Sequence, residues 1–84
     1  MLKIELKFSD EEIRPYILKE ARRIREFYRN VIKYAKNTRA RKQANKYFKL
    51  ADYLVGRLIF FKDEPLMDSI QKTKEYKRFL EKGV

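Results

Sequence analysis

Residues 31–48 read VIKYAKNTRARKQANKYF, and the spacing of the apolar residues in and around this stretch decides the fold. Apolar residues recur every three or four positions on both sides of its middle, as they do on one face of an α-helix. Between Ala35 and Ala40 the step is five, so one continuous helix would turn the second set of apolar residues away from the first. We therefore expect a turn near Asn37 and Thr38, with one of these two residues capping a second helix. No glycine or proline interrupts the stretch, so one long bent helix is the alternative.

Two helical stripes extend outward from this turn. The first recurs at spacings of four and three, and its members are Ile17, Ala21, Ile24, Tyr28, Val31 and Ala35. The second has the same spacings, and its members are Ala40, Ala44, Tyr47, Ala51, Leu54, Leu58 and Phe61. Each stripe is the apolar face of an amphipathic helix. The pattern predicts helices over residues 10–37 and 38–62 that pack as an antiparallel hairpin.

The beginning of the chain has a different pattern. MLKIELKF alternates apolar and charged side chains, which is typical of a half-buried β-strand, so we predict a strand or an extended arm over residues 1–9. Ser9 and Glu12 then have the spacing of a capping box, which starts a helix at its serine. Pro15 would cost that helix an internal hydrogen bond, so a start near Pro15 itself is the alternative.

A third helix is expected after Asp63-Glu64-Pro65, where an acidic N-cap and an early proline favour a new start. Its apolar positions run from Leu66 to Leu80, which predicts a helix over residues 64–82. No linker, repeat or low-complexity segment divides the chain, so residues 1–84 are expected to form one domain. The predicted fold class is mainly α: a short N-terminal β-strand, an antiparallel helix hairpin and a third C-terminal helix in a small helical bundle.

A lone strand leaves backbone hydrogen-bonding groups without partners in its own chain. The expected solution is pairing with the same strand of a second copy in a homodimer, or with a sheet edge in a larger protein complex. Packing on the helices as an extended arm is the third possibility. A chain of 84 residues also buries a limited core, which favours a partner.

The formal net charge of +10 is concentrated in one segment. Residues 1–18 have a net charge of −1 and residues 50–84 a net charge of +1, whereas residues 19–49 hold twelve basic residues and only two acidic ones. A solvated protein surface usually mixes its signs. Segregation of this kind indicates an acidic partner.

On the two predicted helices the basic residues recur at helical spacings, so their side chains point the same way. Like charges in such rows repel, and a ligand rich in phosphate would offset that repulsion. We predict that the outer face of the hairpin binds DNA, or alternatively RNA, mainly through its phosphates, with DNA favoured. The predicted contact residues are Arg22, Arg29, Lys36, Arg39, Arg41, Lys42, Lys46 and Lys49. A solvated helix face and another acidic surface are the alternatives.

Six aromatic residues are interleaved with these charges, as in proteins that stack single-stranded bases on their side chains. They are Phe27, Tyr28, Tyr34, Tyr47, Phe48 and Tyr53. Most lie on or beside the apolar stripes, so packing is their expected role. Tyr53 lies furthest from its stripe and is the best candidate for stacking on a base.

The run Leu58-Ile59-Phe60-Phe61 makes the end of the second helix apolar nearly all round, which indicates burial on more than one side. Either the third helix covers the extra faces, or these four residues form a docking patch for a partner or a second copy. The patch supports a second hypothesis, in which the chain is an accessory subunit docked on a larger replication, transcription or RNA-processing enzyme.

The chain has no cysteine and no histidine. These absences remove thiolate chemistry, the usual zinc ligands and the commonest general base near neutral pH, so we expect no enzymatic activity, metal, cofactor or small-molecule substrate. No apolar run approaches the length of a signal peptide or a membrane span, which favours a cytoplasmic protein without a membrane partner. Charged residues make up 40% of the chain and side-chain amides are few, a composition common in thermophiles.

Overall fold

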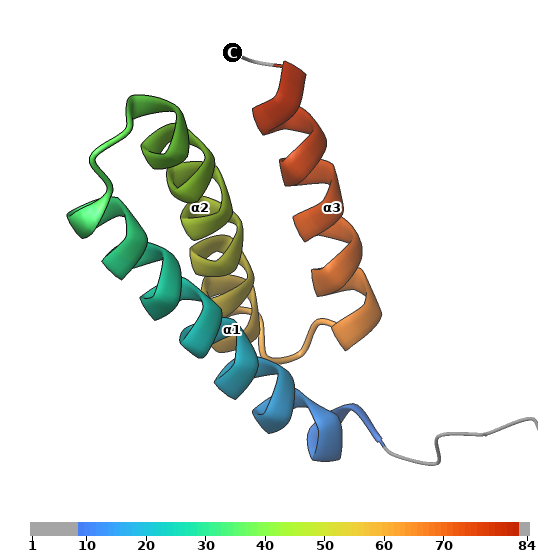
Figure 1. Cartoon of the computed structure of the whole chain (residues 1–84). Coiled ribbons are helices and arrows are strands. Elements are labelled where there is room, and N and C mark those ends of the chain that lie inside the picture. The colour runs from blue at the N-terminus through green and yellow to red at the C-terminus, as the bar shows by residue number, and fades with distance from the viewer. Residues whose placement is uncertain (1–8, 83–84) are drawn as a thin grey trace, which may run out of the picture.

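The computed structural model describes residues 9–82, which form three α-helices (Figure 1). Helix α1 spans Asp10–Tyr34, α2 spans Thr38–Phe60 and α3 spans Leu66–Lys82. The predicted helical bundle, with a hairpin and a third C-terminal helix, is confirmed, although three helix ends differ from the prediction by two or three residues. The predicted strand falls on residues 1–8, outside the described residues, and stays a prediction.

Helix α1 begins at the predicted capping box. The Ser9 backbone is extended, and its hydroxyl oxygen accepts a hydrogen bond from the Glu12 backbone N–H at 3.4 Å. Asp10, Glu11 and Glu12 place three carboxylates in the first turn, where the helix dipole favours negative charge. Pro15 lies inside α1, so the alternative start near Pro15 is wrong. The cap and the acidic first turn stabilise the part of the helix that precedes the proline.

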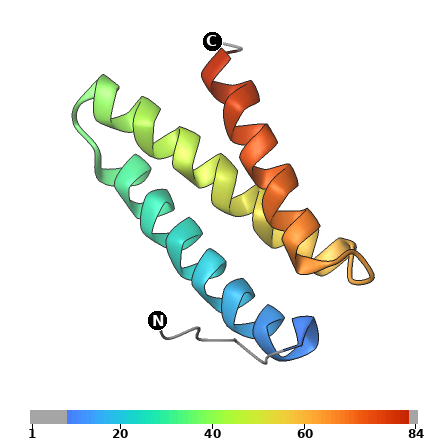
Figure 2. The same ribbon diagram turned by 90° about the vertical axis from the view of Figure 1, so that its right-hand side faces the viewer.

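The turn predicted near Asn37 joins α1 to α2, which excludes a single bent helix. Ala35 leaves the helical conformation with ψ at 125°, and the Asn37 side-chain oxygen accepts from the Arg39 backbone N–H at 2.8 Å, as an N-cap does. The Arg41 guanidinium donates to the Ala35 carbonyl at 2.9 Å, which satisfies an acceptor at the end of α1. The two helices run antiparallel and lie side by side in both views (Figures 1 and 2).

Small residues fill the contact between α1 and α2. Ala21 of α1 and Ala44 and Ala51 of α2 are buried, with at most 8% of their surface exposed. Side chains of this size let two helices approach closely, because the distance between helix axes depends on the side chains at the contact. Val55 and Leu58 complete the buried side of α2 toward its C-terminal end. The core is therefore thin, and aromatic side chains at its edges add to the contact between the helices.

Two stacked pairs of rings flank α2. Tyr28 of α1 stacks on Tyr47 of α2 with 5.3 Å between the ring centroids. Tyr53 of α2 stacks on Tyr76 of α3 with 4.5 Å between the centroids, and the Arg57 guanidinium lies 6.0 Å from the Tyr53 ring. Tyr53 belongs to the contact between α2 and α3, so its ring already has a stacking partner within the chain, and its predicted role as the platform for a base stays a prediction.

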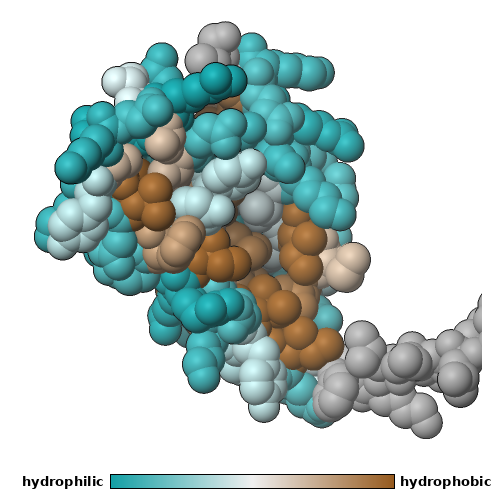
Figure 3. All heavy atoms as spheres, viewed as in Figure 1, coloured by the Kyte–Doolittle hydropathy of each residue, from teal (hydrophilic) through white to brown (hydrophobic). Residues whose placement is uncertain are grey.

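Helix α3 begins directly after Pro65, whose carbonyl accepts from the Ser69 backbone N–H at 3.2 Å. The predicted break at residues 63–65 is confirmed, but the predicted local acidic N-cap is wrong. The Leu66 backbone N–H instead donates to the Asp10 carboxylate of α1 at 2.9 Å. From this start α3 separates from α2 toward its own C-terminal end (Figures 1 and 2), and hydrophobic residues gather between α1 and α3 on the face that Figure 3 shows.

A polar junction at Glu64 ties the turn between α2 and α3 to its surroundings. The Glu64 carboxylate accepts hydrogen bonds from Lys72 at 3.0 Å, from the Ser69 hydroxyl at 2.9 Å and from Arg57. The Glu64 backbone carbonyl accepts from the Arg14 guanidinium of α1. The hydrogen bond from Lys72, with those from Ser69 and Arg57, lowers the pKa of Glu64 to about 2, although removal of the carboxylate from water opposes this change. Glu64 therefore stays ionised in the folded chain under moderately acid conditions.

Replacing Glu64 by glutamine is expected to weaken the acid sensitivity of the fold. A carboxylate whose pKa is lowered on folding stabilises the folded chain above its unfolded pKa of 4.5, and this contribution is lost as the pH falls through about 2. Urea unfolding followed by circular dichroism should show Glu64→Gln less stable than the wild type at about pH 6 and nearly equal to it at about pH 2. Glu75→Gln, at an exposed position of α3, is the matched control. A stability gap for Glu64→Gln that does not change with pH would contradict the role of this junction.

Candidate nucleic-acid interface

Two contacts define how the charged edges of α1 and α2 meet. The Arg25 guanidinium lies 3.1 Å from the Asp52 carboxylate, and the Arg29 guanidinium lies 5.8 Å from the centre of the Phe48 ring. The two helices are antiparallel, so residues near the end of α1 face residues near the start of α2. Arg41, near the start of α2, accordingly donates to the Ala35 carbonyl at the end of α1. The edge of α1 that includes Arg29 and the edge of α2 that includes Phe48 therefore adjoin.

The α1 edge is basic. Arg22, Arg29 and Lys36 follow one another at intervals of seven residues, close to two helical turns, so all three lie on the Arg29 side of the helix. All three are exposed. Three of the predicted contact residues are thus aligned along one edge, as the spacing indicated.

The adjoining edge of α2 is basic as well. Arg41 lies seven residues before Phe48 on the same side of α2, while Lys42 and Lys49 share the next strip of the helix. Arg41, Lys42 and Lys49 are exposed. Six exposed cations on the outer side of the hairpin are together named the basic face below: Arg22, Arg29, Lys36, Arg41, Lys42 and Lys49. Lys42 and Lys49 also line a hollow beside α3, together with Lys46 and Leu80.

The acidic residues on this side of the hairpin are paired. Asp52 pairs with Arg25 at 3.1 Å, and Glu26 pairs with Arg29 at 3.5 Å. Within residues 9–82, five cations of the basic face form no ion pair: Arg22, Lys36, Arg41, Lys42 and Lys49. The basic face therefore keeps an excess of positive charge, and the mutual repulsion of its members favours an anionic ligand.

Two of the predicted contact residues are not part of the basic face: Lys46 borders it but is engaged by α3, and Arg39 lies on another side of α2. The Lys46 ammonium is 3.1 Å from the Glu81 carboxylate of α3, and this hydrogen bond lowers the pKa of Glu81. Lys46 is half-buried and joins α2 to α3. Arg39 lies nine residues before Phe48, two and a half helical turns, which puts it on the opposite side of α2.

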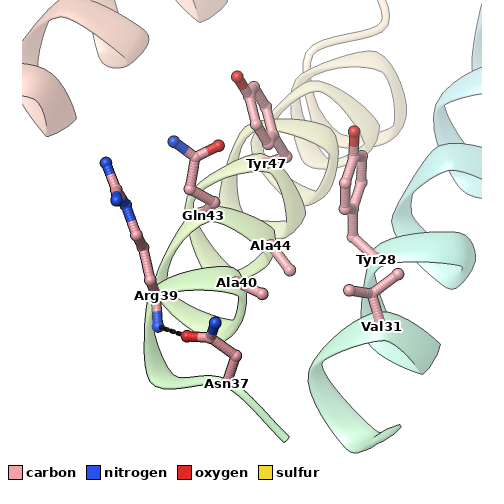
Figure 4. Close-up of a pocket in the computed structure, with 8 residues that line it drawn as sticks. All are labelled: Tyr28, Val31, Asn37, Arg39, Ala40, Gln43, Ala44 and Tyr47. Carbon is pink, nitrogen blue, oxygen red and sulfur yellow. Dashed lines mark hydrogen bonds between the residues drawn. The ribbon is translucent and has the colours of Figure 1, made fainter. Parts of the chain in front are cut away.

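Arg39 lines a pocket of about 460 Å³ at the turn end of the hairpin. Figure 4 shows Arg39, Gln43 and Tyr47 along one side of α2, with the hydroxyl groups of Tyr47 and Tyr28 turned the same way. Apolar side chains between the helices complete its floor: Val31, Ala40 and Ala44. The pocket offers ring faces, an amide and a guanidinium, and none of its lining residues is a carboxylate.

Two aromatic residues expected to pack are exposed. Phe27 and Tyr34 of α1 leave 60% and 72% of their surface in solvent, and Tyr16 leaves 73%. The prediction of packing is wrong for Phe27 and Tyr34 because they lie on an edge of α1 that neither α2 nor α3 covers. The other three are half-buried at the contact between the helices, as predicted: Tyr28, Tyr47 and Phe48.

The four predicted docking residues divide between core and surface. Leu58 is buried, with 2% exposed, and Ile59 is half-buried, so these two side chains pack within the chain. Phe60 and Phe61 are 81% and 48% exposed, and Met67 at the start of α3 is 69% exposed. Helix α3 therefore covers only part of the apolar run, and three exposed apolar side chains remain near the turn between α2 and α3.

Ion pairs between helices were not predicted, although they decide which cations are left without a partner. Asp52 and Glu81 bind basic residues 27 and 35 positions away in the chain. An antiparallel alignment of the two apolar stripes would have brought Arg25 opposite Asp52. Nothing in the local pattern of the sequence places Glu81 beside Lys46.

Metal and membrane sites are not found in the described part of the chain. Within residues 9–82, no three acidic side chains come together to hold a metal ion. None of the three helices is long and apolar enough to cross a membrane. Comparison of the chain with protein families, curated proteins and solved structures found no match. The proposals below therefore rest on the geometry and chemistry of the described residues.

Proposed function

We propose that the chain is a small nucleic-acid-binding protein whose basic face holds the phosphate backbone of DNA or RNA. The observation that supports this most directly is that exposed basic rows lie on both helices of the hairpin, whose charged edges adjoin. The preference for DNA stays a prediction, because both nucleic acids present phosphates.

The physical argument is electrostatic. Each phosphate neutralised by lysine or arginine releases condensed counterions, which drives binding without reading a sequence. Arg22, Arg29 and Arg41 add the two-pronged guanidinium geometry that matches phosphate oxygens. The basic face holds cations but no histidine or cysteine, so the proposal is binding without a catalytic step.

Removal of four cations from the basic face is expected to weaken binding and its dependence on salt. The variant combines Arg29→Gln, Lys36→Gln, Lys42→Gln and Lys49→Gln. Each phosphate contact contributes about −0.9 to the slope of log K against log salt on duplex DNA, so the slope should become shallower by about 2 to 4. Mobility shift or fluorescence anisotropy across a salt series measures both quantities.

The matched control removes the same charge from exposed positions of α3. It combines Lys74→Gln, Lys77→Gln, Arg78→Gln and Lys82→Gln. The control slope should change by less than about 1, since α3 is outside the proposed surface. Equal effects from the two variants would mean that net charge alone drives binding, and an unchanged slope in the first variant would exclude the basic face.

A second candidate function follows from the apolar side chains that α3 leaves exposed. Phe60, Phe61 and Met67 offer a surface through which the chain could dock on a larger enzyme as an accessory subunit. These residues lie at the turn between α2 and α3, whereas Lys36, Arg41 and Lys42 lie near the turn between α1 and α2 at the other end of α2, so one chain has room for both roles.

Photo-crosslinking tests the docking role. A benzophenone amino acid replaces Phe60 in one variant and the exposed Lys74 of α3 in a control. If the chain docks through its apolar end, the Phe60 position should form one adduct with a larger protein, and salt at about 1 M should not prevent it, because apolar contacts are not screened. An adduct of twice the chain mass identifies a homodimer instead, and adducts from both positions or from neither exclude docking at this end.

A further inference from the structure

The exposed aromatic residues of α1 lie on one line. Tyr16, Phe27 and Tyr34 are separated by eleven and seven residues, close to three and two full helical turns. Phe27 and Tyr34 are therefore about 10.5 Å apart along the helix axis, at about 1.5 Å per residue. The Tyr28 ring packs edge-on against Phe27 with 5.1 Å between the centroids, yet Phe27 and Tyr34 remain mostly exposed.

The residues between these rings argue against a docked protein helix. A helix seated on α1 would need apolar residues at every third or fourth position of the line. The intervening positions are instead Glu20, Arg23 and Asn30. Polar and charged side chains therefore separate the three rings along the line, and the one exposed aliphatic side chain beside it is Ile24, which lines a hollow next to Phe27.

A basic side chain lies beside each of the rings of Phe27 and Tyr34. The Lys33 ammonium lies 5.6 Å from the centre of the Tyr34 ring. Arg23 lines a hollow of about 360 Å³ together with Ile24, Phe27 and Tyr28. Arg23 also pairs with Glu20 at 2.8 Å, but both side chains are exposed, and an exposed pair of this kind is weak enough for a phosphate to replace.

Lys33 connects this aromatic line to the basic face. It lies four residues after Arg29 and three before Lys36, so all three belong to one strip of α1. Tyr34 is the next residue along the chain. Phe27 and Tyr34 lie two residues before Arg29 and Lys36, which puts the rings about 160° round α1 from those two cations. A strand that contacts both must therefore cross the outer side of α1, where the Lys33 ammonium lies beside the Tyr34 ring.

We infer that the ligand of the basic face is single-stranded nucleic acid, whose unpaired bases stack on Phe27 and Tyr34 while Arg23 and Lys33 contact its phosphates. The inference rests on the proposed function and names the form of the ligand. In a duplex both faces of each internal base are already stacked, so exposed rings gain nothing there, whereas an unpaired base leaves a face open. Stacked nucleotides rise about 3.4 Å each, so the two rings match bases about three positions apart.

The test compares three labelled ligands by fluorescence anisotropy: a single strand of about twelve nucleotides, the same strand with abasic sites, and a duplex of equal length. Phe27→Ala combined with Tyr34→Ala should lower affinity for the single strand roughly thirtyfold or more, because stacking contributes about 1 to 3 kcal/mol per base. Affinity for the duplex and the abasic strand should change less than about threefold. The wild type should bind the abasic strand about as weakly as the variant binds the normal one.

Phe60→Ala combined with Phe79→Ala removes two exposed rings from the other helices and is the matched control. Circular dichroism verifies that both double variants stay folded. The inference is overturned if the wild type prefers the duplex, if abasic sites make no difference, or if both double variants lose affinity equally. It is also overturned if Phe27→Ala with Tyr34→Ala changes only the sedimentation of the chain, since the rings then serve association between copies. Absence of binding to every ligand at low salt would instead overturn the proposed function itself.

Discussion

The close approach of α1 and α2 is the constraint on which the rest of the structure depends. Ala21, Ala44 and Ala51 put little bulk between the two helices, so side chains at the edges of the contact reach across it. Arg25 then meets Asp52, and Arg29 lies over Phe48. The same register makes the basic edges of the two helices adjoin. Larger residues in the alanine positions would separate the helices and, with them, the two halves of the basic face.

The thin core and the closely spaced basic residues both limit the stability of the folded chain. A thin core supplies limited hydrophobic stabilisation, and the net stability of small domains is only a few kcal/mol. The rows of like charge reduce it further. The polar junction at Glu64 and the contact between Asp10 and the start of α3 compensate by fixing the chain where the three helices meet. A bound polyanion would add to stability, because a ligand that binds only the folded chain shifts the folding equilibrium toward it.

Apolar periodicity, together with local capping and proline signals, predicted the three helices, the turn at Asn37 and the break before Leu66, because these features depend on neighbouring residues. Contacts between distant residues were not predictable in this way. Asp10 caps α3 from 56 residues away, and Arg14 reaches the Glu64 carbonyl from 50 residues away. The strand prediction for residues 1–8 has no structural test here.

In the candidate site, too, the alignment of residues along one helix was predictable, whereas contacts between helices were not. The helical spacing aligned Arg22, Arg29 and Lys36 correctly, but only the position of α3 shows that Lys46 is engaged by Glu81. Three aromatic residues also have environments that the sequence pattern did not indicate. Tyr53 looked exposed until α3 supplied Tyr76 as its partner, whereas Phe27 and Tyr34 looked like core residues because the apolar stripe is wider than the surface that α2 covers.

The measurement that tests the central claim most directly is an NMR titration of the ¹⁵N-labelled chain with a single strand of about twelve nucleotides. Binding at the basic face predicts the largest changes in amide chemical shift in residues 22–36 of α1 and 41–49 of α2, with small changes along α3. The changes should diminish with added salt. The largest changes in α3 or between Phe60 and Met67, or equal changes over all three helices, would contradict the account.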